Sequence, residues 1–144
     1  MFSSPAAQVL NQIAALHRNS MPTYLSFTHP WAGEGDEEAV DVLRQIAIDH
    51  KYVVDKIMTP LEAAGQDEHL GNFPMEYTGL HDLSIEYLVR RAVPYQELLI
   101  RRLEDLLDGM PDEAAPRELA EESLGLAKGH LKNLQEAIAD LASS

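Results

Sequence analysis

Apolar residues recur at intervals of three and four positions in four long segments of this chain, and this spacing constrains the fold more than any other feature. The spacing places the apolar side chains of each segment on one face of an α-helix. The segments extend from about Pro5 to Thr28, from Asp36 to Gly65, from Thr78 to Gly109, and from residues 112–116 to Leu141. None shows the alternation of a β-strand. Four long amphipathic helices in 144 residues predict an all-α protein, a four-helix bundle that forms a single domain.

Prolines and connections refine this prediction. Pro22 should kink the first helix or split it near Ser20, and Pro94 should kink the third. The first two helices and the last two are joined by short links, as in antiparallel hairpins. The middle connection, residues 65–77, could span roughly 43–47 Å when extended. A helix of about 28 residues is roughly 42 Å long, so this connection could cross the whole bundle or form a compact loop at one end.

The composition excludes several classes of function. The chain has 24 acidic and 11 basic residues, a net charge of −13, which argues against nucleic acid and anionic membranes as partners. It has no cysteine, which excludes disulfides, thiolate chemistry and iron–sulfur clusters. The first residues lack the pattern of a signal peptide, and no apolar run reaches membrane-spanning length. We therefore expect a cytoplasmic protein.

Three histidines interrupt the apolar stripes. His17, His50 and His130 lie at stripe positions near the middle of the first, second and fourth helices, and Tyr95 lies near the middle of the third. Helix midpoints in a bundle lie at roughly one level, so these side chains are predicted to converge inside the apolar core. We call His17, His50 and His130 the histidine layer.

The sequence also contains an internal repeat. A shift of 80 residues places the second helix on the fourth and matches His50 with His130. Each of these histidines has an alanine three residues before it, Ala47 and Ala127. This coincidence indicates a duplicated helical hairpin.

Two helical hairpins, a longer middle connection and a central polar layer resemble the ferritin-like superfamily, which includes rubrerythrin- and bacterioferritin-type proteins. In that family the first and third helices each supply a metal-binding Glu, and the second and fourth each supply Glu-x-x-His. Here residues 47–50 and 127–130 read Ala-x-x-His, and His17 and Tyr95 occupy the other two positions. The resemblance implies this fold with a degenerate di-metal site, because two closely spaced irons need bridging carboxylates.

Four carboxylates flank the stripes and could in principle replace the missing ligands. They are Asp49, Asp55, Glu86 and Glu97. Asp49 directly precedes His50 in the sequence, so its side chain points about 100° away from that of His50 around the helix. We expect all four on the solvated face.

Two functions of different class follow from these observations. The first is a ferritin-like bundle without a carboxylate-rich diiron site, acting as a non-redox binding or structural module and forming a homodimer through its helix faces. The second is a metalloprotein in which His17, His50 and His130 bind one divalent transition metal, zinc or iron, with Tyr95 or water as a fourth ligand. The sequence leaves open whether such a site would be catalytic. It also leaves open a purely structural layer, in which the histidines bond to one another, to Tyr95 or to water.

Overall fold

The computed structural model describes residues 2–28, 36–63, 73–75, 77 and 84–143. Every regular element in these residues is helical, which confirms the all-α prediction. The helices are α1 (Ser4–Arg18), α2 (Met21–Thr28), α3 (Glu37–Ala63), α4 (Ile85–Asp108) and α5 (Ala114–Ser143). Within the described residues, no helix has both the length and the apolar character needed to cross a membrane.

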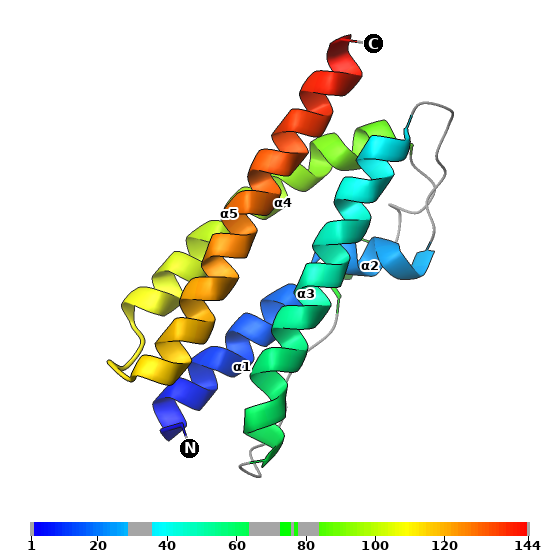
Figure 1. Cartoon of the computed structure of the whole chain (residues 1–144). Coiled ribbons are helices and arrows are strands. Elements are labelled where there is room, and N and C mark those ends of the chain that lie inside the picture. The colour runs from blue at the N-terminus through cyan, green and yellow to red at the C-terminus, as the bar shows by residue number, and fades with distance from the viewer. Residues whose placement is uncertain (1, 29–35, 64–72, 76, 78–83, 144) are drawn as a thin grey trace.

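The first predicted helix is split, as the position of Pro22 indicates. α1 ends at Arg18, where the backbone N–H of Asn19 donates to the carbonyl of Ala15 and that of Ser20 donates to the carbonyl of His17. Pro22 is the second residue of α2, where the missing N–H needs no helical partner. As Figure 1 shows, α2 leaves the direction of α1 after this break.

The helix ends depend on local capping. Ser3 accepts a hydrogen bond from Ala6 N at 3.3 Å through its Oγ and caps α1. Ser84 caps α4 in the same way through Tyr87 N, and Gly109 ends α4 as predicted. The predicted start of this helix near Thr78 lies outside the described residues. Pro94 lies inside α4 without ending it.

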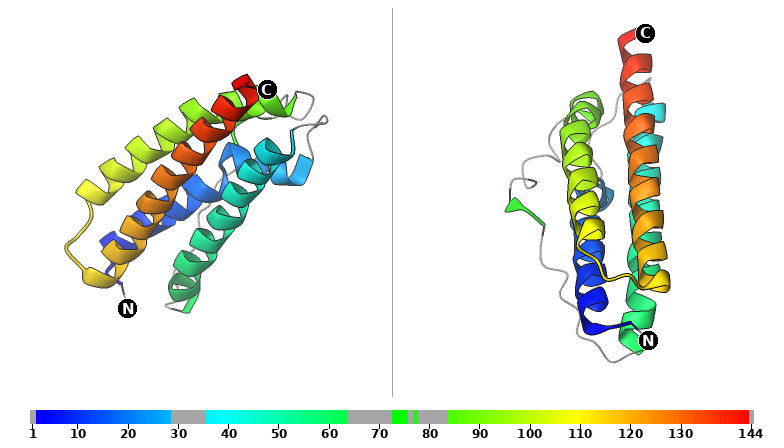
Figure 2. Two further views of the ribbon diagram at one scale, coloured as in Figure 1. Left: turned by 45° about the horizontal axis from the view of Figure 1, so that its top comes forward. Right: turned by 90° about the vertical axis from the view of Figure 1, so that its left-hand side faces the viewer.

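The helices form two layers, with α1 and α4 in one and α3 and α5 in the other (Figure 2). α4 packs most extensively on α5, α1 on α3, and α3 on α5, whereas α1 and α4 touch only sparsely. α3 and α4 run in the same direction, so α4 begins at the opposite end of the molecule from the end of α3 (Figure 1). Most of the middle connection, residues 65–77, lies outside the described residues.

The core consists of two apolar clusters with the histidine layer between them. One cluster contains Leu10, Ile57 and Leu103, and the other contains Ile46 and Leu134. In α3 and α5 the histidine lies where the helix passes from one cluster to the other, and His17 lies between the α1 residues of the first cluster and Met21 of the second. This position makes the layer the polar centre of an otherwise apolar core.

Candidate functional site: the histidine layer and the adjoining cleft

The structure brings the three predicted histidines together. His17, His50 and His130 expose 1%, 1% and 4% of their surface. The ring centroids of His17 and His50 are 4.7 Å apart, and those of His50 and His130 are 5.6 Å apart. Both pairs meet edge to face. The stripe positions in the sequence therefore identify a real set of neighbouring imidazoles.

The hydrogen bonds of His17 define its tautomer. Its Nδ1 lies 2.8 Å from the carbonyl oxygen of Ile13, which can only accept, so Nδ1 carries the proton. The lone pair of Nε2 then accepts from the hydroxyl of Ser123 at 3.2 Å. The neutral ring is thus bonded at both nitrogens.

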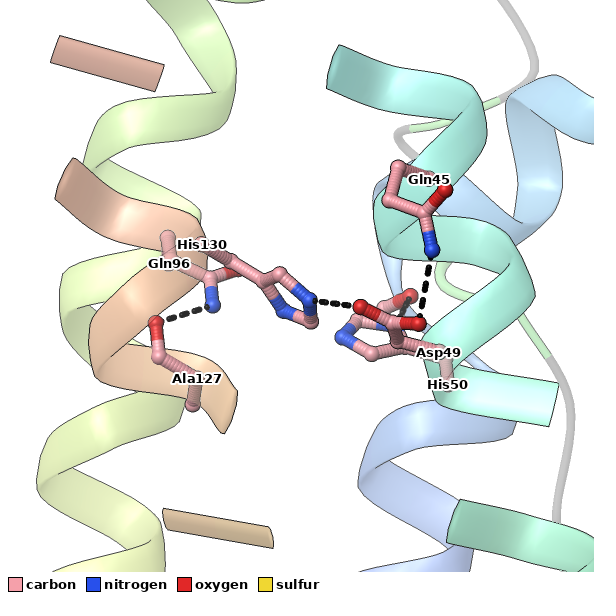
Figure 3. A network of polar contacts seen from close by, with 7 residues as sticks. Gln45, Asp49, His50, Gln96, Ala127 and His130 are labelled. Atoms are coloured by element: carbon pink, nitrogen blue, oxygen red, sulfur yellow. Dashed lines mark hydrogen bonds and ion pairs between the residues drawn. The ribbon is translucent and has the colours of Figure 1, made fainter. Parts of the chain in front are cut away.

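His130 is fixed by a carboxylate. Its Nε2 lies 2.7 Å from Oδ2 of Asp49, and the other carboxylate oxygen accepts from Gln45 at 2.9 Å (Figure 3). The expectation that Asp49 lies on the solvated face is wrong, because its side chain is only 25% exposed and bonds to His130. α3 packs against both α1 and α5, so its buried arc is wider than one apolar stripe. Nε2 of His130 donates to Asp49, which leaves a lone pair on Nδ1.

A chain of donors defines the tautomer of His50. Thr23 Oγ1 lies 3.0 Å from the carbonyl oxygen of His17 and must donate to it. Thr23 therefore accepts from the hydroxyl of Ser20 at 3.0 Å. Ser20 Oγ in turn accepts from Nδ1 of His50 at 2.7 Å, which leaves a lone pair on Nε2 of His50.

Two of these lone pairs have no partner among the described residues. They belong to Nε2 of His50 and Nδ1 of His130, both buried. In Figure 3 the unbonded nitrogen of His50 lies on the side of its ring that faces His130. A buried acceptor without a partner costs about 1–3 kcal/mol, so these two atoms mark the position where a hydrogen-bond donor or a cation would be stabilised.

Burial keeps His17 and His50 uncharged near neutral pH. Desolvation lowers the pKa of His17 to about 4, against a smaller opposing effect of its bond to Ile13. Desolvation also lowers the pKa of His50 well below 6.5, and the neighbouring imidazoles of His17 and His130 lower it further. Both rings are therefore weak bases, and His50 keeps an unpartnered lone pair on Nε2.

The residues around the layer do not form a finished metal site. In the described part of the chain, no three His, Cys, Asp or Glu side chains surround one point closely enough to hold an ion. Asp55 and Glu86 form exposed ion pairs with Lys51 and Arg90 on their own helices, at 3.2 and 3.3 Å, and Glu97 is also exposed. The metal-binding role of the histidines and Tyr95 stays a prediction.

Tyr95 contacts an aromatic ring and a guanidinium group. Its ring contacts Tyr77 at a centroid distance of 5.4 Å, and the guanidinium of Arg91 lies 5.4 Å from its centroid. The buried polar residue of α4 is Gln96, which is 3% exposed and donates to the carbonyl of Ala127 at 2.9 Å (Figure 3). The spacing of α4 could have revealed Gln96, because it lies four residues after the buried Ala92.

A cleft of about 380 Å³ adjoins the layer, between α4 and the break that separates α1 from α2. Its apolar walls include Leu16, Met21 and Leu98, and two tyrosines, Tyr77 and Tyr95, add aromatic surface. The sparse packing of α1 on α4 leaves this edge of the molecule open. Hydrophobic periodicity did not indicate the cleft, because the cleft depends on a helix break and on a segment outside the helices.

Polar residues connect the cleft with the layer. Asn19, Ser20, Gln96 and Arg102 line it, and the hydroxyl of Ser20 is the one that accepts from His50. A molecule in the cleft would thus lie one hydrogen bond away from the layer. Comparisons with protein-family models, curated proteins and solved structures give no match for this chain, so the function of the site has to be inferred from its own geometry.

Proposed function

We propose that this chain is a ferritin-like four-helix bundle that acts as a non-redox module and binds a small organic molecule in the cleft. Counting α1 and α2 as one broken helix gives four helices, of which the second and third run in the same direction. The positions that correspond to the family's second- and fourth-helix glutamates are Ala47 and Ala127. This argues for a bundle whose activity does not depend on paired irons.

The size and chemistry of the cleft carry this proposal. Sites for small molecules are usually concave, about 300–1,000 Å³ in volume, mostly apolar and provided with a few polar groups that orient the ligand. The cleft has about 380 Å³, apolar walls and polar side chains at Asn19, Ser20, Gln96 and Arg102. A single-ring ligand matches this space and this mixture of surfaces.

The Ser20–His50 pair favours binding over hydrolysis. In a serine hydrolase, the histidine accepts the proton of the nucleophilic hydroxyl. Here the hydroxyl of Ser20 donates to Thr23 and accepts from His50, which is the opposite direction. The lowered pKa of His50 also makes it a weak general base.

The proposal is tested by titrating ¹⁵N-labelled protein with benzyl alcohol and mapping the amide shifts. We expect the shifts to concentrate at the break between α1 and α2 and around Leu98. Leu98→Trp should abolish binding by filling the cleft, since Leu98 lines it. Ile48→Trp is the matched control, because Ile48 is 54% exposed on α3. Unchanged binding by Leu98→Trp, or no binding by the wild type, would contradict the proposal.

A second candidate is supported by the lone pairs of the histidine layer. In zinc and iron sites, a ligating histidine usually gives its other N–H to a carbonyl, carboxylate or hydroxyl, and all three histidines here do so. Two imidazoles on a tetrahedral ion, with metal–nitrogen distances near 2.1 Å, place their ring centroids about 5 Å apart. The distances of 4.7 and 5.6 Å lie on either side of this value, so the spacing of the rings is compatible with a shared ion.

Metal analysis of protein prepared without a histidine tag tests this second candidate. One equivalent of zinc or iron, or visible absorption bands on adding Co²⁺, would support it. His50→Leu should then abolish binding. In a purely structural layer, His50→Leu should instead raise the free energy of unfolding, because it removes a buried lone pair that has no partner. Substoichiometric metal together with no thermal shift on adding these ions would exclude the site.

A further inference from the structure

We infer that the cleft selects an organic anion, and that Arg102 recognises its carboxylate or sulfonate group. This inference rests on the proposed binding function and specifies the ligand class. Among the described residues that line the cleft, Arg102 is the sole charged side chain. In a chain with 24 acidic and 11 basic residues, a cleft with only a positive charge is unusual and defines the polarity of its ligand.

The guanidinium of Arg102 is available for a ligand. Three other arginines have polar partners: Arg44 pairs with Asp41, Arg90 pairs with Glu86, and Arg117 donates to two backbone carbonyls. Arg102 has no ion-pair or hydrogen-bond partner among the described residues. A planar guanidinium with five N–H donors matches the two oxygens of a carboxylate, which favours an anion over a neutral polar group.

The rest of the cleft defines the body of the ligand. Tyr77 and Tyr95 present aromatic surface, and Leu16, Met21 and Leu98 present aliphatic surface. These residues suit an aromatic ring better than a sugar or a phosphate ester, both of which need many polar contacts. An aryl carboxylate would place its ring among the tyrosines and leucines and direct its charge to Arg102.

The test compares two probes of nearly equal shape, benzoate and benzyl alcohol, by amide shift titration at neutral pH and low salt. We expect benzoate to bind more tightly than benzyl alcohol. Arg102→Gln should reduce benzoate affinity roughly tenfold or more and leave benzyl alcohol unaffected. Arg101→Gln is the matched control, because it removes the same charge from the adjacent, exposed residue that does not line the cleft. The net charge of −13 repels anions, so nonspecific attraction would not produce the expected preference.

The outcomes separate this inference from the function on which it rests. If benzyl alcohol binds in the cleft and benzoate binds no better, the anion inference is overturned and the binding function stands. If both substitutions weaken benzoate equally, the effect comes from overall charge and Arg102 is not the recognising group. If neither probe binds the wild type, the proposed function itself fails. A preference for benzoate that disappears at 1 M salt supports the exposed Arg102 as its source.

Discussion

Acidification from pH 8 to pH 5 should destabilise the folded protein through the histidine layer. In the unfolded chain, His17 and His50 have a pKa near 6.5. In the folded state, burial lowers the pKa of His17 to about 4 and that of His50 well below 6.5. The unfolded state therefore binds more protons between about pH 4 and 6.5. The stabilisation is complete above pH 6.5 and is lost as the pH falls through this window.

The magnitude follows from the two pKa values of His17. A shift from 6.5 to about 4 contributes about 3 kcal/mol when fully expressed, of which about 2 kcal/mol is lost between pH 8 and pH 5. His50 acts in the same direction and adds at most about 2 kcal/mol at pH 5, the limit for a histidine that stays neutral when folded. The pair could thus remove about 4 kcal/mol, a large part of the roughly 5–15 kcal/mol that stabilises a typical domain.

The assay is urea unfolding followed by circular dichroism at 222 nm, at pH 5, 6, 7 and 8. The free energy of unfolding should decrease toward pH 5. His17→Gln removes one of the two titrating groups, so its pH dependence over this range should be shallower by about 2 kcal/mol, whatever its stability at pH 8. The reasoning is refuted if the wild type is equally stable at pH 5 and pH 8, or if the variant keeps the full pH dependence.

Three further predictions concern the core and the assembly. Asp49→Ala should lower the free energy of unfolding by about 1–3 kcal/mol in urea titrations at pH 8, because it leaves the buried Nε2 proton of His130 without an acceptor; an unchanged stability would argue that this bond is not maintained in solution. Leu134→Ala should cost about 2–5 kcal/mol in the same assay, since Leu134 is fully buried; a loss below 1 kcal/mol would show that the core collapses around the gap. The homodimer expected from the sequence should sediment at twice the chain mass of 16.0 kDa, and a single species of 16.0 kDa would contradict it.

Hydrophobic periodicity predicted the parts of the structure that depend on single helices. An apolar stripe shows which residues of a helix face the core, whatever helix packs against it. This is why His17, His50 and His130 could be identified as core residues before their partners were known. Local chemistry was equally informative at the break near Ser20 and at the glycine that ends α4, because both depend on neighbours in sequence.

The partners of these side chains depend on which helices are adjacent, and a stripe contains no such information. Asp49 contacts His130 because α5 packs beside α3, a contact between residues 81 positions apart. Gln96 was overlooked because a polar residue does not count toward an apolar stripe. The cleft is formed by the break after α1 together with Tyr77, which is distant in sequence. No single segment of the sequence therefore predicts the cleft.

The neutral rings of His17 and His50 bear on which of the two candidate functions is favoured. A core with several buried carboxylates needs a metal ion or a basic partner, because unpaired buried charge is very costly. Here Ala47 and Ala127 bring no charge, and Asp49 remains 25% exposed at the edge of the layer. Four of the six ring nitrogens bond to Ile13, Ser123, Ser20 and Asp49. These four bonds involve protein groups alone, and this favours the binding module. The two remaining lone pairs, on His50 and His130, are the one feature that a structural role does not explain. Whether a metal ion is bound at these two histidines is therefore the measurement that decides between the candidates.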